Sequence, residues 1–193
     1  MKLVGITGSI GCGKTTLAKI LKKLGYAVFD IDAWVRKIYH NKSFLNVLEK
    51  NFTGSVKNGV ADKRYLRKIV FSDKNKLDLL ESLIYPFLNH NIRKVVNRYA
   101  CDNYICFLDA ALLFEKKWDK FCDIIILADV DYEIQKQRVM KRDGISADDF
   151  DKINNIQLKN EYKKELSDVV IDTNKNINLL KVELIEILKG LEY

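Results

Sequence analysis

The sequence contains few residues that would suggest a metal centre, a membrane segment or a secreted scaffold. Its 193 residues include one proline, two histidines and four cysteines. The cysteines form no C-x-x-C pair and have no metal-ligand spacing with the histidines, which we expect on the surface. No apolar run approaches the roughly 20 residues of a membrane span, and the first residues lack the apolar stretch of a signal peptide. We therefore expect a cytoplasmic protein with buried thiols and no membrane partner. The cysteines and histidines are Cys12, Cys101, Cys106, Cys122, His40 and His90.

The positive charge is not concentrated in any one segment. The chain carries 33 Lys and Arg against 26 Asp and Glu, a net charge of +7, and the basic residues are spread along its length. A nucleic-acid adaptor would need clustered charge and stacking aromatics on a strand face, and the sequence has neither. A basic enzyme that handles phosphates has the same balance. We expect no nucleic-acid partner, and we expect a monomer.

The first thirty residues predict a strand, a helix and a second strand. Residues 2–6 form a short apolar run typical of a buried strand, and residues 15–24 have apolar positions at helical spacing. Gly25 stands where such a helix ends. Residues 26–29 predict the second strand, which leads into Asp30-Ile31-Asp32. A βαβ unit of this kind indicates a parallel sheet.

The middle of the chain, residues 33–100, is expected to be helical and to form an insertion that covers the substrate. Gly54 and Asn58-Gly59 predict turns within it. Pro86 disfavours helical geometry at the preceding residue, so a long helix should be split or kinked there.

Further strands are expected at residues 104–108, 123–128 and 169–171, because these are near-continuous apolar runs. Helices are expected at residues 131–142 and 176–188. The second should be amphipathic, with one apolar face turned inward. The fold class is therefore α/β, with a five-stranded parallel sheet in three layers and helical insertions. The inward residues of the last helix are Ile177, Leu180, Leu184 and Leu188.

The segment Gly8 to Thr15 carries the clearest chemical signal. It fits the pattern G-x-x-x-x-G-K-[ST] between a predicted strand and a predicted helix, which is the P-loop of nucleotide-binding proteins. Its glycines let backbone N–H groups converge on phosphate oxygens, and the helix start adds a positive dipole. Lys14 should reach the outer phosphates, and the Thr15 hydroxyl should bind Mg²⁺. The residues expected to bind ATP are Ser9, Ile10, Gly11, Cys12, Gly13, Lys14, Thr15, Thr16 and Arg142.

Acidic and basic residues outside this loop have two readings each. Asp109 follows an apolar strand, where it could support Mg²⁺ or cap the next helix. Asp32 follows the second strand, expected beside the P-loop strand, and could accept a hydroxyl proton or cap a helix from Ala33. Arg138 and Arg142 lie on one helix face before Gly144, where they could belong to a lid over the phosphates or to a solvated surface.

Taken together, these segments resemble the dephospho-CoA kinase family over almost the whole chain. The P-loop with Ile10 between its glycines is similar to the family's opening, and residues 28–32 with Arg36 resemble its D-x-D segment. Residues 58–71 resemble the family's D-G-x-L-D-R motif followed by V-F. Residues 112–115 resemble the end of its P-L-L-F-E motif. Gln135 with Arg138 and Arg142, then Gln157 and residues 167–171, are similar to its later motifs. The order and spacing of these matches carry the resemblance.

The resemblance implies a phosphotransferase with an alcohol acceptor. It would use ATP and Mg²⁺ to phosphorylate the ribose 3′-hydroxyl of dephospho-CoA. Its implied catalytic residues are Asp32 as base, Lys14, and Arg138 as transition-state stabiliser, with Thr15 and Asp109 at the metal. The helical insertion would bind the CoA portion, and a lid is expected at about residues 138–160. The implied substrate-binding residues are Asp32, Arg36, Lys63, Tyr85 and Leu112.

Some positions depart from that family's pattern, and the sequence leaves two other functions to consider. Lys63 stands in place of an arginine that could bind bidentately. The other departures are Ser9 for glycine, Cys12 for serine, Tyr85 for histidine and Ala111 for proline. Another small-molecule kinase, such as a nucleoside monophosphate kinase, has the same P-loop. A GTPase switch is disfavoured, because Asn174-Lys175-Asn176-Ile177 lacks the final carboxylate of a guanine-binding N-K-x-D.

Overall fold

The computed structural model describes residues 2–71, 73–99 and 105–191. It contains two compact units, the first formed by Met1–Asp30 with Tyr99–Tyr193 and the second by Ile31–Arg98. The second unit occupies nearly the stretch expected for the helical insertion, about residues 33–100. Cys101 and Tyr104, expected as a buried thiol and the start of a strand, lie outside the described residues.

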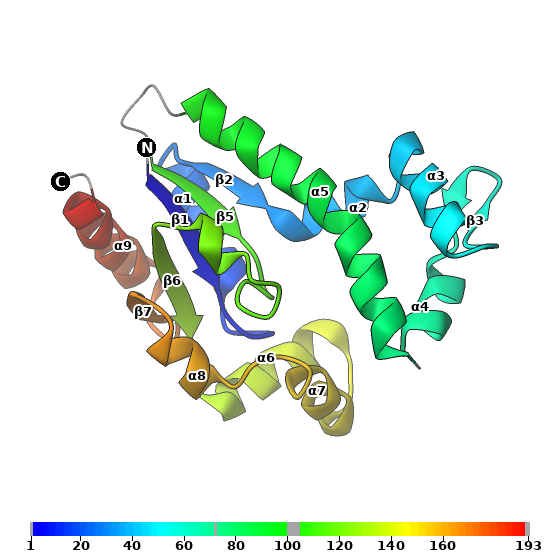
Figure 1. Ribbon diagram of the computed structural model, residues 1–193. Helices are drawn as coiled ribbons and strands as arrows, with labels where there is room; N and C mark the ends of the chain where they lie inside the picture. Colours follow the sequence, from blue (N-terminus) through cyan, green and yellow to red (C-terminus); the bar gives the residue numbers. More distant parts are fainter. Residues whose placement is uncertain (1, 72, 100–104, 192–193) are drawn as a thin grey trace. The chain divides into compact units, whose positions relative to one another are not determined.

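The first unit is built on a five-stranded parallel sheet, as the sequence predicts (Figure 1). The strand order is β2-β5-β1-β6-β7, and every pairing is parallel. One expectation is wrong: β2 does not lie beside the P-loop strand β1, because β5 pairs between them. The strands are β1 (Lys2–Thr7), β2 (Ala27–Asp30), β5 (Ile105–Asp109), β6 (Ile124–Asp129) and β7 (Val169–Asp172).

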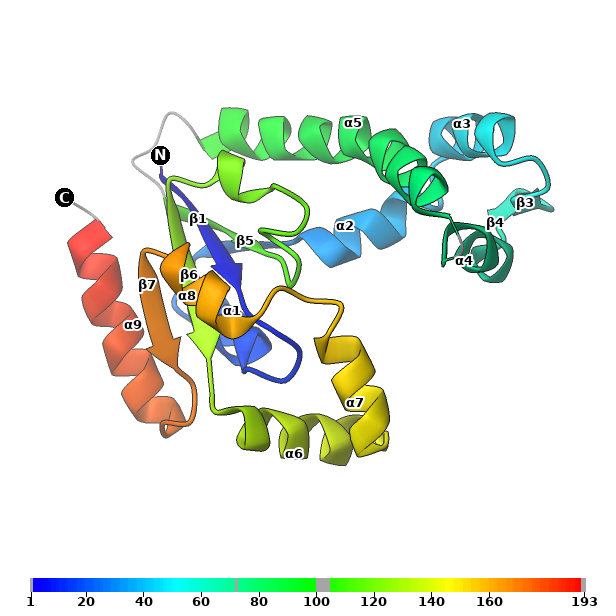
Figure 2. The same ribbon diagram turned by 60° about the horizontal axis from the view of Figure 1, so that its bottom comes forward.

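Two helices of the first unit share one apolar core with the sheet. The core cluster combines alternate side chains of β1, such as Val4 and Ile6, with buried leucines of the first and last helices. Figure 2 shows α9 beside β7 at the edge of the sheet. Gly5 faces the other side of β1, where an added Cβ would lie 2.9 Å from side-chain atoms of Leu113 and Cys122. The segment after β5 therefore covers the second face. The helices are α1 (Lys14–Lys23), α6 (Tyr132–Asp143), α7 (Ala147–Asn154), α8 (Asn160–Glu165) and α9 (Ile177–Leu191), with a 3₁₀ turn at Asp119–Phe121.

The second unit is mostly helical but contains a small hairpin that the sequence reading gave only as a turn. Asn58 and Gly59 have φ values of 51° and 74°, the left-handed pair that closes a tight two-residue hairpin. The Asn-Gly pair is a strong sequence signal for this structure. The elements are α2 (Ile31–Ile38), α3 (Lys42–Asn51), β3 (Val56–Lys57), β4 (Val60–Ala61), α4 (Lys63–Phe71) and α5 (Lys74–Tyr99).

Of the two outcomes expected at Pro86, a split helix or a kinked one, the split does not occur, because α5 runs through Pro86 without interruption. Figure 2 shows that its axis bends along its length, as a proline inside a helix requires.

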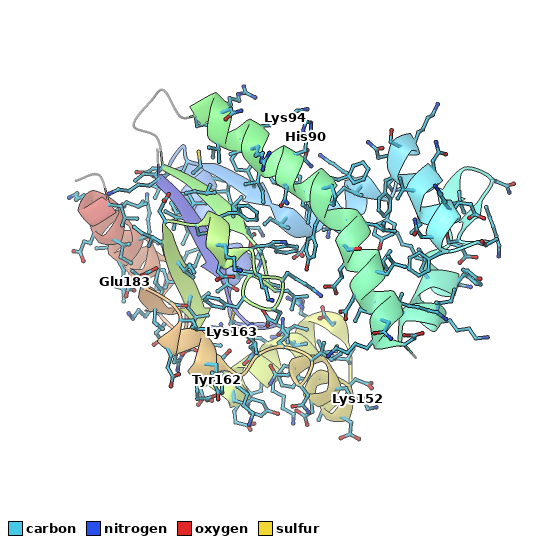
Figure 3. The ribbon with its side chains drawn as sticks, in the orientation of Figure 1. His90, Lys94, Lys152, Tyr162, Lys163 and Glu183 are labelled. Carbon is cyan, nitrogen blue, oxygen red and sulfur yellow. The ribbon has the colours of Figure 1, made fainter. Side chains whose placement is uncertain are left out.

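Aromatic rings pack together in the core of this unit, where Phe44 lies edge-on against both Tyr39 and Phe87. His40 and His90 are exposed, as expected, and Figure 3 labels His90 on α5.

The closing helix α9 agrees with its predicted pattern except at its first residue. Leu180, Leu184 and Leu188 are buried, whereas Ile177 is 56% exposed and was wrongly expected to face inward. Ile177 starts the helix and lies in the wall of a cavity described below. Across the described ranges, we find no helix with the length and apolarity needed to cross a bilayer.

Two leucines of α9 form a matched test of the core. Leu184 is fully buried, and Leu179 is 59% exposed on the same helix. Leu184→Ala should lower the free energy of unfolding by about 2–5 kcal/mol, because it removes buried methyl groups and leaves a cavity. Leu179→Ala should change it by less than about 0.5 kcal/mol. Equilibrium urea unfolding followed by circular dichroism measures both, and equal effects would contradict the packing of α9.

Candidate active site

A cavity of about 600 Å³ opens over the loop between β1 and α1. Its wall combines this loop with side chains of α6, the segment after β7 and the start of α9. The structure brings all the residues expected to bind ATP into this one wall, together with Arg138. Those residues are Ser9, Ile10, Gly11, Cys12, Gly13, Lys14, Thr15, Thr16 and Arg142.

Two glycines of the loop are required by backbone geometry and by close contacts. Gly11 and Gly13 have φ values of 79° and 90°, which residues with side chains rarely adopt. An added Cβ at Gly11 would lie 2.4 Å from Val139 Cγ2, and one at Gly13 would lie 2.8 Å from the Thr173 side chain. The loop therefore packs directly against α6 and the end of β7.

Helix α1 starts at Lys14 with no side chain capping it. Gly13 occupies the N-cap position and makes no side-chain hydrogen bond. The first N–H groups of a helix have no intrahelical acceptor, and the helix dipole makes this end positive. An uncapped helix start facing a cavity suits a phosphate group.

Lys14 and Asp109 form an ion pair at the floor of the site. Asp109 is the last residue of β5, and the parallel register places it opposite Ile6 of β1. The Lys14 ammonium donates a hydrogen bond to Asp109 Oδ1. Asp109 is only 8% exposed, so its carboxylate is held close to the loop with a cation beside it. Within the described part of the chain, Asp109 accepts from the side-chain ammonium of Lys14 and not from a backbone N–H, which favours the phosphate-site reading over a cap.

The oxygen donors near the loop fit Mg²⁺ better than a metal held wholly by protein. Among the residues that the structure describes, no three His, Cys, Asp or Glu residues gather as a metal site. Mg²⁺ bound to a nucleotide takes most of its ligands from phosphates and water and needs only one or two protein oxygens. The Asp109 carboxylate and the Thr15 hydroxyl are hard oxygen donors of that kind.

Arg138 points from α6 to the end of β7. Its Nη1 and Nη2 donate to the Thr173 hydroxyl at 3.2 Å and to the Thr173 carbonyl at 3.1 Å. The Thr173 hydroxyl in turn donates to the Cys12 carbonyl at 2.6 Å. Arg138 is thus connected to the loop through Thr173. An arginine on a solvated surface would not need these contacts.

Arg142 lies one turn further along α6 and is paired with its neighbour. Its guanidinium makes two hydrogen bonds of 2.7 Å to Asp143, which lower the pKa of that carboxyl. Gly144 then ends α6 in the left-handed conformation. Helix α7 packs back on α6, where Lys136 Nζ lies 3.1 Å from Asp151 Oδ2. The expected lid, at about residues 138–160, includes the end of α6, Gly144 and α7. That this segment moves remains a prediction.

Cys12 is a buried neutral thiol within the loop. Its side chain is fully buried, and burial raises its pKa to about 11. A thiol with that pKa carries almost no thiolate at neutral pH, so it has little nucleophilic or metal-binding character. Cys106 and Cys122, the other cysteines that the structure describes, are also free thiols, and burial raises the pKa of each.

Four polar side chains that hold the loop were absent from the expected site. Gln135 and Gln157 contact Ile10, Asn160 contacts Ser9, and Thr173 contacts Cys12. Gln135 and Gln157 resemble family positions, but the sequence gave no role for them. Each contact joins residues more than 100 positions apart, so no local pattern reveals it.

In the second unit, two of the expected substrate-binding residues share a cavity of about 260 Å³. Arg36 projects from α2 and Lys63 starts α4, and the Lys63 ammonium lies 5.4 Å from the centre of the Tyr39 ring. Arg67 adds a third cation to the same wall. The rest of the wall is aliphatic, so the cavity sets three cations and an aromatic ring around an apolar surface.

The remaining expected residues lie outside that cavity wall. Asp32 is in the first turn of α2, so the reading of Asp32 as the cap of a helix from Ala33 is wrong. Tyr85 lies on α5 and donates to Glu81 at 3.3 Å, and burial is the main cause of its raised pKa. Leu112 is in the turn after β5 in the first unit, next to Ala111 in the wall of the loop cavity.

A further cavity of about 640 Å³ lies behind the loop, between the ends of β6 and β7, α6, and the segment before α8. It was not expected from the sequence. Its wall combines apolar residues such as Val130 and Ile134 with polar ones that include Gln135, Gln157 and Asn160, the side chains that reach the loop.

Comparisons with known proteins agree with this geometry. The family model described as "CoaE: Dephospho-CoA kinase" matches residues 2–178. A dephospho-CoA kinase of Bartonella quintana is 35% identical over 99% of this chain and 98% of its own length. One of Fusobacterium nucleatum is 38% identical over 94% and 95%. The crystal structure of TT1252 from Thermus thermophilus superposes with a TM-score of 0.86 at 31% identity, over 98% of this chain and 97% of that one. The chain belongs to the dephospho-CoA kinase family.

Proposed function

We propose that this protein transfers the γ-phosphate of ATP to the ribose 3′-hydroxyl of dephospho-CoA, giving CoA and ADP. The observation that carries the proposal is the loop cavity, where an uncapped helix start, Lys14 and Asp109 converge. Membership of the dephospho-CoA kinase family supports the acceptor. A cytoplasmic location and a monomeric state accompany the proposal.

The nucleotide's phosphates would occupy the loop cavity. Backbone N–H groups of Gly11, Gly13 and Thr15 and the positive end of α1 would offer hydrogen bonds and favourable charge to phosphate oxygens. Lys14 would contact the outer phosphates, leaving Asp109 free to face the metal. When bound, Mg²⁺ would neutralise charge on the phosphates, held on the protein side by Thr15 and Asp109.

Asp32 would orient the acceptor hydroxyl and take its proton as the oxygen attacks the γ-phosphorus. The new P–O bond forms on the acceptor while the bond to the β-phosphate oxygen breaks, and ADP leaves with that electron pair. Arg138 and Arg142 would balance the negative charge of the transferring group, as lid arginines do in related enzymes.

The contacts with the acceptor's remaining groups are inferred residue by residue from the family resemblance. Arg36 and Lys63 lie in the cationic cavity of the second unit, which suits the phosphates of a nucleotide. Lys63 gives a single-point contact in place of the family's bidentate arginine. Tyr85 and Leu112 complete the proposed contacts.

The acceptor can be tested directly. Incubation with ATP, Mg²⁺ and dephospho-CoA should give CoA, detected by mass spectrometry as the addition of one phosphoryl group. AMP, CMP and UMP in place of dephospho-CoA should give less than about one hundredth of that rate, since specific sites discriminate strongly by hydrogen bonding. Faster phosphorylation of a nucleoside monophosphate would instead favour a nucleoside monophosphate kinase.

The charge of Lys14 should be essential for turnover. Lys14→Ala removes the cation at the phosphates, and kcat should fall by about 10²–10³-fold, as when one transition-state donor is lost. Lys23→Ala is the matched control, because Lys23 is exposed at the other end of α1. It should retain its rate. Circular dichroism checks that both variants fold, and a near-normal rate for folded Lys14→Ala would contradict the active-site assignment.

Asp32→Asn tests the proposed base. The amide cannot accept the hydroxyl proton, so kcat should fall by about 10²–10⁴-fold while the Kd of ATP changes little. Steady-state kinetics and isothermal titration with ATP separate the two effects. Asp78→Asn, at an exposed position of the same unit, should retain its kcat. Parallel losses in kcat and in ATP affinity would assign Asp32 a structural role in α2.

A further inference from the structure

Ile10 of the phosphate loop is held at both of its backbone groups by glutamine side chains. Its N–H donates to Gln157 Oε1 at 2.8 Å, and its carbonyl accepts from Gln135 Nε2 at 2.5 Å. Gln135 lies on α6, and Gln157 lies in the segment between α7 and α8. A single loop residue is therefore clamped from two directions by parts of the chain far away in sequence.

The clamp determines where neighbouring amides point. A trans peptide unit is planar, with its C=O and N–H directed oppositely. When Gln135 holds the Ile10 carbonyl, the N–H of Gly11 in the same peptide unit must point away from Gln135. The Ser9 carbonyl is also fixed, because it accepts from the N–H of Cys12 at 3.2 Å. The orientations of successive loop peptides are thus set by one hydrogen bond from outside the loop and one within it.

The two glutamines are themselves rigidly placed. Gln135 is only 1% exposed, and its Nε2 also lies 3.4 Å from Asn154 Oδ1 at the end of α7. A buried amide is costly without hydrogen-bond partners, so its orientation toward Ile10 is strongly favoured.

The segment that follows Gln157 is held by several polar contacts. The N–H of Leu158 donates to Glu115 Oε1 at 2.9 Å. The same oxygen lies 3.0 Å from the ammonium of Lys163, which is fully buried on α8 (Figure 3). Asn160 donates to Asp129 at 3.0 Å and accepts from the Ser9 hydroxyl at 2.6 Å. Gln157 therefore contacts Ile10 from a fixed support.

We propose that Gln135 and Gln157 are positioning residues that clamp Ile10 and so aim the loop's amides at the nucleotide phosphates. This inference rests on the proposed function for its link to turnover. Neither glutamine acts on the reacting atoms, and both act through the backbone of Ile10. Losing either should weaken phosphate binding without changing the affinity for the acceptor.

Three glutamine-to-methionine variants test the clamp at nearly constant side-chain size. Gln135→Met and Gln157→Met each remove one hydrogen bond to Ile10. Each should raise the Kd of ADP and the KM of ATP by about tenfold, the equivalent of one hydrogen bond, and should leave the KM of dephospho-CoA within about twofold. Gln137→Met is the control, because Gln137 is exposed on the same helix, and its constants should match the unmodified protein.

A fourth variant gives a readout that loss of packing would not produce. Gln135→Glu places a carboxylate against the Ile10 carbonyl at high pH, so nucleotide affinity should be lost. Below its pKa, which burial raises, the carboxylic acid can donate a proton to that carbonyl. The ADP affinity of Gln135→Glu relative to the unmodified protein should therefore recover as pH falls from 8 to 5.5, with the melting temperature recorded at each pH.

The outcomes separate this inference from the proposed function. ADP affinities within twofold of the unmodified protein in folded Gln135→Met and Gln157→Met would overturn the clamp. If Gln135→Met does not fold, the ADP affinity of Gln157→Met tests the clamp instead. Gln157 lies in a partly exposed segment, where a substitution disturbs folding less. A rise in the KM of dephospho-CoA equal to the rise in the KM of ATP would also count against the clamp. An unmodified protein that binds ADP but makes no CoA would contradict the proposed function, while the ADP titrations would still decide the clamp.

Discussion

The position of β1 between β5 and β6 is the constraint on which the candidate active site depends. Parallel pairing brings the carboxyl ends of these strands to one edge of the sheet, with Ile6 opposite Asp109 and Thr7 opposite Leu127. The loop that follows β1 therefore meets Asp109 from β5, α6 from β6, and Thr173 from β7. Residues from widely separated parts of the sequence share one cavity because the strands that precede them are neighbours.

The loop is also the part of this site that can least maintain its own shape. Glycines allow its turn, but they have greater conformational freedom to lose and no side chains with which to fix it. The surrounding structure supplies that restriction: Thr173 holds the Cys12 carbonyl, and Gln135 holds that of Ile10. Preorganised donors are worth more to phosphoryl transfer than flexible ones, because no reorganisation is needed when charge develops.

Local patterns in the sequence predict part of the fold and of the candidate site, whereas long-range contacts determine the rest. The P-loop, the buried strands and Asp109 at a strand end were readable, because each depends on short-range composition and spacing. The hairpin at Asn58-Gly59 had a local signal that was interpreted only as a turn. The position of β5 beside β1 had none, since strand order is set by tertiary packing. Gln135 and Gln157 likewise reach Ile10 across more than 100 residues.

The two departures from the family pattern inside the loop are accommodated by different physics. Ser9 gains a hydrogen bond, because its hydroxyl donates to Asn160 at 2.6 Å and Asn160 is oriented by Asp129. Cys12 gains burial: its thiol is fully enclosed, and the resulting desolvation keeps it neutral with a pKa of about 11. One change adds a polar tether to α8, and the other adds apolar volume under the loop without adding charge near the phosphates. Neither change introduces a charge beside the backbone N–H groups that we propose for the nucleotide.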